Sequence, residues 1–287
     1  MCQRAVSFRR IWIIILAGMI LQACSSQFIY DRIDRIAQFY IERYIGLDKD
    51  QSSLLKVNLA SLKEWHRQEE LKGYQQFLNE IESDLQGHVS AETVAGWVQR
   101  LRQAYNQVRD RALPPMIEMA QTLSDAQVQE LAANMEKRNS KLEKEYLARD
   151  DSEYRESAYD EMDDRLREWL GRLTPEQKQR LHAAVSRLER LDQAWLDGRR
   201  SWQKQIIGEL QRKPGWQSRL TALVIKGNEY SNEQDVAASH RNEQHVYEAV
   251  ADVLNMRNGS QRIKLQEKLD NWKKDLAELQ NYRQKSG

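Results

Sequence analysis

Apolar residues recur at helical spacing along most of the chain. One stripe, with steps of three and four residues, consists of Leu181, Ala184, Leu188, Leu191 and Trp195. Side chains three or four positions apart lie on one face of a helix, and other elements must cover that face. Sustained period-two runs of β-branched residues, which are typical of strands, do not occur. The pattern therefore predicts an all-α fold.

Stretches rich in glycine, proline and asparagine separate the expected helices. We expect helices at residues 26–45, 49–86, 91–112, 125–170, 175–212, 215–226, 232–257 and 260–284, with a break at "LPP" between the third and the fourth. Helices of this length favour an elongated multi-helix bundle or a curved helical layer. Residues 24–287 should form one helical domain, with two lobes around residues 113–115 as the alternative.

The first residues have the features of a secretory signal. Arg4, Arg9 and Arg10 precede an apolar run at residues 11–21, and no acidic residue lies among them. As a helix this run would rise about 16 Å, roughly half of a hydrocarbon core of about 30 Å. We therefore predict that residues 1–23 are a signal peptide that is removed.

The sequence "LQAC" follows directly and resembles the lipobox of bacterial lipoproteins. The resemblance implies that Cys24 carries a diacylglycerol on its sulfur and an acyl group on its amine. These lipids would anchor the protein in a membrane. Ser25 after the cysteine implies sorting to the outer membrane, facing the periplasm. The alternative is ordinary secretory cleavage after Ala23, which leaves a free thiol.

Charge and cysteine content narrow the possible classes of protein further. Removing the signal leaves 41 of the 44 basic residues against 43 acidic ones, a net charge of about −2. This balance argues against nucleic acid, which calls for a concentrated basic face. Cys2 leaves with the signal, so the mature chain can form no internal disulfide.

A short motif occurs twice at expected helix starts, as "LTPEQ" and "LSDAQ". Its key positions are Leu173, Thr174 and Gln177 in one copy, and Leu123, Ser124 and Gln127 in the other. A Ser or Thr followed three residues later by Gln is a capping box, in which the two residues satisfy each other's backbone N–H groups. Asp48 with Gln51, and Ser231 with Gln234, repeat this logic.

The same motif resembles the paired signature of the LTxxQ family of Spy-type periplasmic chaperones. That resemblance implies binding of unfolded clients. This chain is roughly twice as long as those proteins and lacks their basic character. Each helix cap stabilises its helix by about 1 kcal/mol, and capping alone explains the motifs. Capping is therefore the favoured interpretation.

A second resemblance covers more of the chain. The segments around "ERYIGLDKDQ" and "EWHRQEELKGY" are similar to uncharacterised Gram-negative lipoproteins with a domain of unknown function, number 6279. The matching residues are Tyr30, Tyr40, Tyr44, Leu47, Gln51, Trp65, His66, Arg67, Glu70, Leu71 and Tyr74. The resemblance implies a helical lipoprotein and names no activity.

Catalytic motifs are not found. His66 and Glu70 are one helical turn apart and could share a ligand or a hydrogen bond. An ordinary pairing on a packed helix is the favoured interpretation, and metal binding or acid–base chemistry is the alternative. His240 and His245 are poorly spaced for zinc. The acidic run at residues 149–168 lacks the order of a calcium loop and is typical of a solvated helix face. We predict no catalytic residue, no metal and no further cofactor.

Tryptophans supply the candidate binding surface. Trp195 and Trp202 lie on one face of an expected helix, and Trp65, His66 and Arg67 form a second candidate for partner binding. Core packing of these rings is the favoured alternative.

We therefore expect a lipid-anchored, non-enzymatic periplasmic helical protein that binds or scaffolds other envelope proteins or unfolded clients. A hydrolase or metal-dependent enzyme centred on His66 and Glu70 is the alternative. Oligomeric state and client identity do not follow from the sequence.

Overall fold

The computed structural model describes residues 26–228, 230 and 232–281, and every regular element in this part of the chain is helical. The predicted all-α fold is therefore confirmed. The predicted signal peptide and Cys24 lie outside the described residues. None of the helices in the described part is both long and apolar enough to span a bilayer.

The helices follow one another with short connections. Their order is α2 (Ser26–Asp31), α3 (Ile33–Glu42), α4 (Lys49–Trp65), the π-helical turn η1 (His66–Glu70), α5 (Leu71–Asp84), α6 (Ala91–Thr122), α7 (Asp125–Tyr146), α8 (Asp151–Leu170), α9 (Pro175–Ser186), α10 (Asp192–Glu209), α11 (Trp216–Lys226), α12 (Glu233–Asn255) and α13 (Gly259–Asn281).

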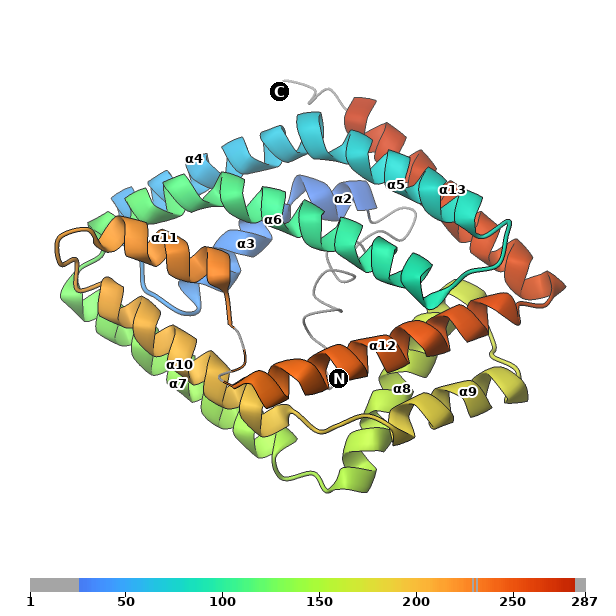
Figure 1. The fold of residues 1–287 in the computed structure, drawn as a ribbon. Helices are drawn as coiled ribbons and strands as arrows, with labels where there is room; N and C mark the ends of the chain where they lie inside the picture. The colour runs from blue at the N-terminus through green and yellow to red at the C-terminus, as the bar shows by residue number, and fades with distance from the viewer. Residues whose placement is uncertain (1–25, 229, 231, 282–287) are drawn as a thin grey trace.

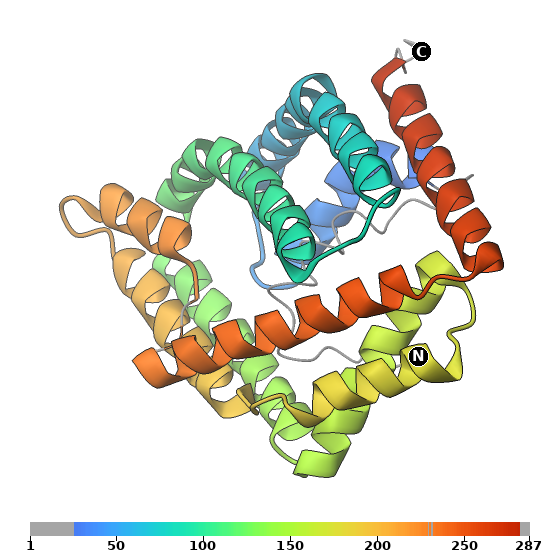
Figure 2. The ribbon, with the colours of Figure 1, turned by 45° about the vertical axis from the view of Figure 1, so that its right-hand side comes forward.

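The bundle curves round and closes into a ring (Figure 1). Along the ring, α5 packs on α13, α13 on α8, α8 on α9, α9 on α12, α12 on α6, and α6 on α4, which η1 joins to α5. In the turned view, α12 crosses below the start of α6 and leads into α13 (Figure 2). A second group, α7, α10 and α11, packs beside the ring. It contacts the ring through α11 against α6, and through hydrogen bonds between α7 and α4.

Burial follows this division. The largest apolar cluster joins residues of α5, α6, α8, α9, α12 and α13, and includes fully buried Leu181 and Met162. A smaller cluster around Ile206, Leu210 and Trp216 joins α10 and α11 to the end of α6 and the start of α7. The helix stripes seen in the sequence are therefore covered by neighbouring helices, as their periodicity requires.

The helix break expected at residues 113–115 is wrong, because α6 continues through Pro114 and Pro115. Two prolines remove the donors for two carbonyl groups one turn earlier. These carbonyls belong to Asp110 and Arg111, which are exposed, so water can reach them. Leu113 is buried beside the prolines and anchors the helix there. The alternative of two lobes stays a prediction.

Two long helices expected from the sequence are each divided. The expected helix at 125–170 ends at Tyr146 and restarts at Asp151, where Asp150 and Glu153 form a capping box. The expected helix at 175–212 is interrupted after Ser186. There the side chain of Asn242 takes both backbone groups of Glu189, accepting its N–H at 2.9 Å and donating to its carbonyl at 2.7 Å.

The predicted cap of Ser231 with Gln234 is also wrong. Helix α12 is capped by Asn232, whose side chain accepts the N–H of Asp235 at 2.8 Å. Ser231 lies outside the described residues.

Candidate functional site

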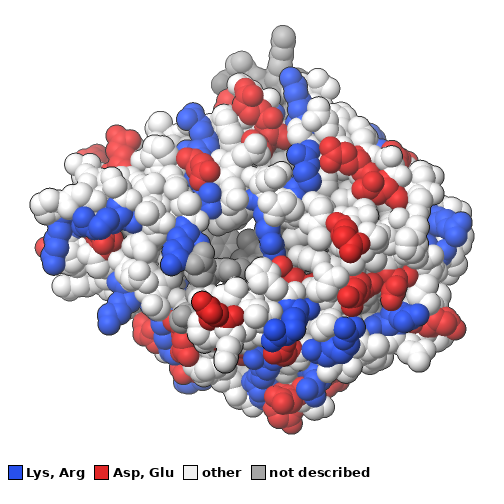
Figure 3. Space-filling model, in the orientation of Figure 1, with Lys and Arg blue, Asp and Glu red and all other residues white. Residues whose placement is uncertain are grey.

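A cavity of about 620 Å³ lies inside the ring. Its wall is built by α2, α3, α4, η1, α5, α6, α8, α12 and α13, and most of its side chains are aliphatic or aromatic. The space-filling view shows a hollow near the middle of the face that faces the viewer (Figure 3). The volume falls within the range of about 300–1,000 Å³ of small-molecule sites.

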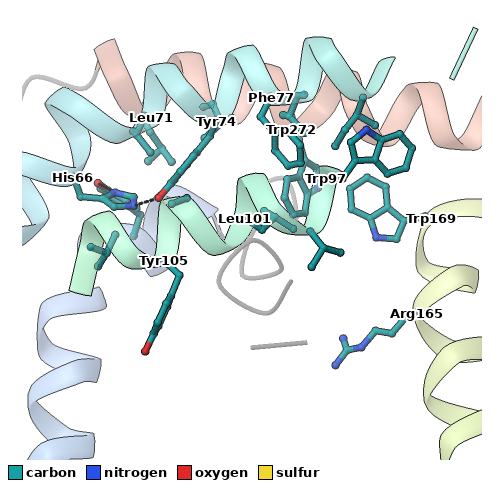
Figure 4. A pocket seen from close by; sticks show the side chains of 18 of the residues that line it. His66, Leu71, Tyr74, Phe77, Trp97, Leu101, Tyr105, Arg165, Trp169 and Trp272 are labelled. Carbon is teal, nitrogen blue, oxygen red and sulfur yellow. Dashed lines mark hydrogen bonds between the residues drawn. The ribbon is translucent and has the colours of Figure 1, made fainter. Parts of the chain in front are cut away.

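Three tryptophans from three helices meet at one end of the cavity (Figure 4). The rings of Trp169 on α8 and Trp272 on α13 have centroids 5.2 Å apart. Trp97 on α6 donates its indole N–H to Asp84 at 2.7 Å. The described part of the structure gives no hydrogen-bond partner to the buried indole N–H of Trp272. This end of the wall is therefore broad and mainly aromatic, and Arg165 on α8, which pairs with Glu168 at 3.8 Å, adds a cationic side chain to the lining.

A histidine held between two tyrosines lies at the other end (Figure 4). The hydroxyl of Tyr30 is 3.0 Å from Nδ1 of His66, and the hydroxyl of Tyr74 is 3.1 Å from Nε2. Burial lowers the pKa of His66 to about 4 and raises that of Tyr30 to about 12. The group is therefore neutral at physiological pH and offers hydrogen bonds without charge.

The π-helical turn places this histidine. Leu71 follows His66 by five positions, which in an α-helix puts side chains about 140° apart. The wider turn of η1 lets both residues line the cavity, together with Tyr74. Such π turns occur frequently at functional sites, and the apolar pattern of the sequence gave no sign of this one.

The neighbours of His66 point elsewhere. Arg67 is buried over the ring of Tyr30, with its guanidinium 5.5 Å from the ring centroid, and pairs with Asp31 at 3.8 Å. Trp65 is half-buried and does not line the cavity. That Trp65, His66 and Arg67 bind a partner stays a prediction; of the three, only His66 lines the cavity.

The structure does not bring His66 and Glu70 together. Both ring nitrogens of His66 are bonded to tyrosines, and Glu70 does not line the cavity. Burial raises the pKa of Glu70, with a smaller contribution from Glu69. Among the described residues, no group of three His, Cys, Asp or Glu side chains is placed to hold a metal ion.

The capping boxes at Gln51, Gln127 and Gln177 are present as predicted. The structure adds that their glutamines pair across helices. Gln177 donates to Oε1 of Gln261 at 2.9 Å and receives a bond from that residue at 2.8 Å. Gln261 caps α13 together with Asn258. The sequence predicted a helix from residue 260, but this capping pair was missed.

The second pair repeats this arrangement between α4 and α7. Gln51 and Gln127 exchange amide hydrogen bonds of 3.1 and 2.6 Å. Each of the four amides also accepts the N–H of its own capping residue and donates to a backbone carbonyl, at Thr122, Gly46, Val253 or Arg172. We call the two pairs the amide junctions. A glutamate could not replace these glutamines, because it lacks the donor N–H₂.

The apolar partners of these motifs are buried: Leu123 and Leu173 pack in different clusters. Trp195 and Trp202 also belong to different clusters. Trp195 packs on Tyr146 with centroids 6.1 Å apart, while Trp202 donates its N–H to the carbonyl of Leu223 at 2.8 Å. Partner binding by these two rings stays a prediction.

Sequence reasoning missed most of the cavity. Trp97, Trp169 and Trp272 each lie on a different helix, and nothing in a helical pattern shows that they converge. Tyr74 entered only through a family resemblance. The one available signal was the density of aromatic residues at helical spacing, which is equally typical of a solid core.

The fold and the cavity define an all-helical protein that closes around an apolar centre. The chain belongs to a family of unknown function, DUF6279, whose model matches residues 43–236. The predicted membership is thereby confirmed. The match runs from the segment before α4 into α12 and includes His66 and Tyr74. No curated protein and no solved structure matches the chain.

Proposed function

We propose that this protein is a non-enzymatic, lipid-anchored binding protein of the outer membrane, and that its cavity holds apolar groups of other envelope molecules. The observation that carries the proposal is a closed ring around about 620 Å³ of mainly apolar space. Such a space is costly to leave in contact with water, because apolar surface is stabilised by burial. A ligand with an apolar group would cover it.

Binding of a neutral fluorescent probe, N-phenyl-1-naphthylamine, tests this proposal. The probe becomes bright in apolar surroundings and should bind saturably to the chain from residue 25, which contains every described element. Ala104 on α6 lines the cavity, so Ala104→Trp should weaken binding severalfold. Ala133 is exposed on α7, which does not line the cavity, so Ala133→Trp is the matched control and should leave binding unchanged. Equal binding by both variants would count against the cavity.

Anchoring is tested separately. Cys24→Ala should release the protein from membranes or leave an uncleaved precursor, because the resemblance to a lipobox makes this thiol the site of lipid attachment. Unchanged processing and membrane association would refute the anchor.

A chaperone is the more specific form of the proposal. The aromatic wall suits apolar side chains of unfolded clients, and the motifs at Leu123–Gln127 and Leu173–Gln177 resemble those of LTxxQ chaperones. Suppression of aggregation of an unfolding test protein by the chain from residue 25, weakened by Ala104→Trp, supports this form. Absence of suppression leaves binding of a smaller apolar ligand.

The enzymatic alternative keeps His66 and Glu70 as its centre. Stoichiometric zinc or manganese in the purified protein, lost in His66→Ala, would favour it. The neutral hydrogen bonds of His66 to two tyrosines favour a binding role instead.

A further inference from the structure

The cavity wall is long, and its polar groups are gathered at few points. Lining residues follow α5 from Leu71 to Leu85, a span of about 21 Å at 1.5 Å per residue. On α6 they run from Val94 to Val108, a span of equal length. An extended palmitoyl chain has a similar length, so the wall can cover such a chain from end to end.

The chemistry of the wall separates hydrocarbon from peptide. A peptide carries an N–H and a carbonyl at every residue, and burying them without partners is costly. Along α5 and α6 the lining side chains between the two ends are almost all apolar. A hydrocarbon chain needs no hydrogen bonds there. The wall therefore fits an acyl chain better than an extended peptide.

The polar end of the cavity is suited to a carbonyl oxygen. A neutral imidazole has one donor and one acceptor nitrogen. When Tyr30 donates to Nδ1 of His66, Nε2 donates to Tyr74, and the hydroxyl proton of Tyr74 remains available to the cavity. In the other tautomer, Tyr30 donates to the carbonyl of Lys63 at 3.3 Å. Switching between the two would let the trio adapt to a bound oxygen.

Among the described residues, the charged side chains at this end are paired. Lys63 lines the cavity but pairs with Asp34 at 3.1 Å and donates to the carbonyl of Asp31 at 3.0 Å. An ionised carboxylate at Tyr74 would therefore be buried without a free cation beside it, which is unfavourable. An ester or amide carbonyl carries no charge and avoids this cost.

We propose that the cavity binds one long saturated acyl chain joined through an ester or amide, with its carbonyl at Tyr74 and His66 and its methyl end near Trp97, Trp169 and Trp272. The inference rests on the proposed function, because it names the ligand of the same cavity. Two sources supply this chemistry: a lipid of the membrane, and the acyl group predicted on Cys24 of the same chain. Cys24 precedes Ile29 in the cavity wall by five positions, a reach of at most about 18 Å.

Quenching of tryptophan fluorescence by dibrominated methyl stearate tests the proposal, because bromine quenches indoles that it contacts. Titration into the chain from residue 25 should quench part of the emission and saturate at one equivalent. Replacing Trp97, Trp169 and Trp272 by Phe should abolish the quenching. Trp195 and Trp202 do not line the cavity, so the matched control replaces these two by Phe and should still be quenched.

The polar end has its own test. Dibrominated stearic acid, ionised at neutral pH, should bind at least about tenfold more weakly than the methyl ester, because a buried carboxylate would lack a partner. Tyr74→Phe should weaken binding of the ester severalfold and leave binding of N-phenyl-1-naphthylamine, which has no carbonyl, unchanged. Equal binding of acid and ester would overturn the assignment of the polar end.

The lipidated protein, extracted from membranes, distinguishes the two sources. If the acyl group on Cys24 occupies the cavity, the added ester should quench the tryptophan fluorescence of the chain from residue 25 and not that of the lipidated protein. If a membrane lipid is the ligand, both forms should be quenched alike. Absence of saturable quenching in both forms overturns the inference. If N-phenyl-1-naphthylamine still binds and Ala104→Trp still weakens that binding, the proposed function stands without the acyl ligand. If this probe does not bind either, the proposed function and the acyl ligand are both refuted.

Discussion

The two amide junctions use one design in two different environments. Gln177 and Gln261 join α9 to α13 within the ring of helices, with exposed fractions of 0% and 1%. Gln51 and Gln127 join α4 to α7 at the edge of the second group of helices, where Gln127 is only half-buried. The hydrogen bonds are equivalent, so any difference in stability must come from burial.

A third helix start shows what the glutamine adds. Helix α8 begins with Asp150 and Glu153, which form the same capping box, but Glu153 is exposed and caps only its own helix. A carboxylate can accept the N–H of the capping residue and cannot donate to a second side chain. Glutamine at this position therefore marks a joint between helices, whereas glutamate marks a simple cap.

The largest expected effect is at the buried junction. Gln177→Ala removes a cap interaction and leaves the amide of Gln261 and the carbonyl of Val253 without their partner. Each unsatisfied buried group costs about 1–3 kcal/mol, so we expect the free energy of unfolding to fall by about 4 kcal/mol. Denaturation by urea measures this. A loss below that of Gln127→Ala would contradict the role of burial.

Acid should lower the stability of the ring of helices through His66. Its pKa in the folded protein is about 4 because of burial, against about 6.5 when unfolded. The unfolded chain therefore binds the extra proton between these values, so this contribution to stability is complete above pH 6.5 and is lost as the pH falls towards 4. The loss amounts to about 3 kcal/mol.

The variant His66→Gln isolates this effect from the carboxylates, which titrate in both proteins. Its stability should fall less steeply between pH 6.5 and 4 than that of the unchanged chain. His88 is exposed, so His88→Gln is the control and should keep the full slope. Parallel curves for all three proteins would show that folding does not lower the pKa of His66.

The open junction should tolerate the same change better. Gln127→Ala breaks the bonds to Gln51 and to the carbonyl of Gly46. Water can reach part of this site, so we expect a loss of about 2 kcal/mol, half of that at Gln177. A double-mutant cycle with Gln51→Ala and one with Gln177 and Gln261 should give the larger coupling energy at the buried pair. Equal coupling energies would show that burial does not separate the junctions.

The sequence predicted the helical fold and three of the four glutamine caps, because periodicity and capping are local. It missed Gln261, since "NGS" was interpreted only as a break, and it could not predict that glutamines 76 and 84 residues apart would pair. The π turn at His66 was equally hidden, because it changes the direction of side chains without changing the apolar pattern. The cavity was hidden for the same reason, because its wall brings together residues that are far apart in the sequence.

The smallest expected effect distinguishes the contribution of a helix cap from that of an amide junction. Thr174 and Ser124 each accept the N–H of their glutamine at 3.2 Å, and neither takes part in the exchange between glutamines. Thr174→Ala and Ser124→Ala should therefore each cost about 1 kcal/mol, as ordinary cap losses do. Equal losses in urea denaturation, beside unequal losses for the glutamines, would assign the difference between the two regions to the amide pairs. A clearly larger loss for Thr174→Ala would instead mean that the surroundings of α9 strengthen the cap itself.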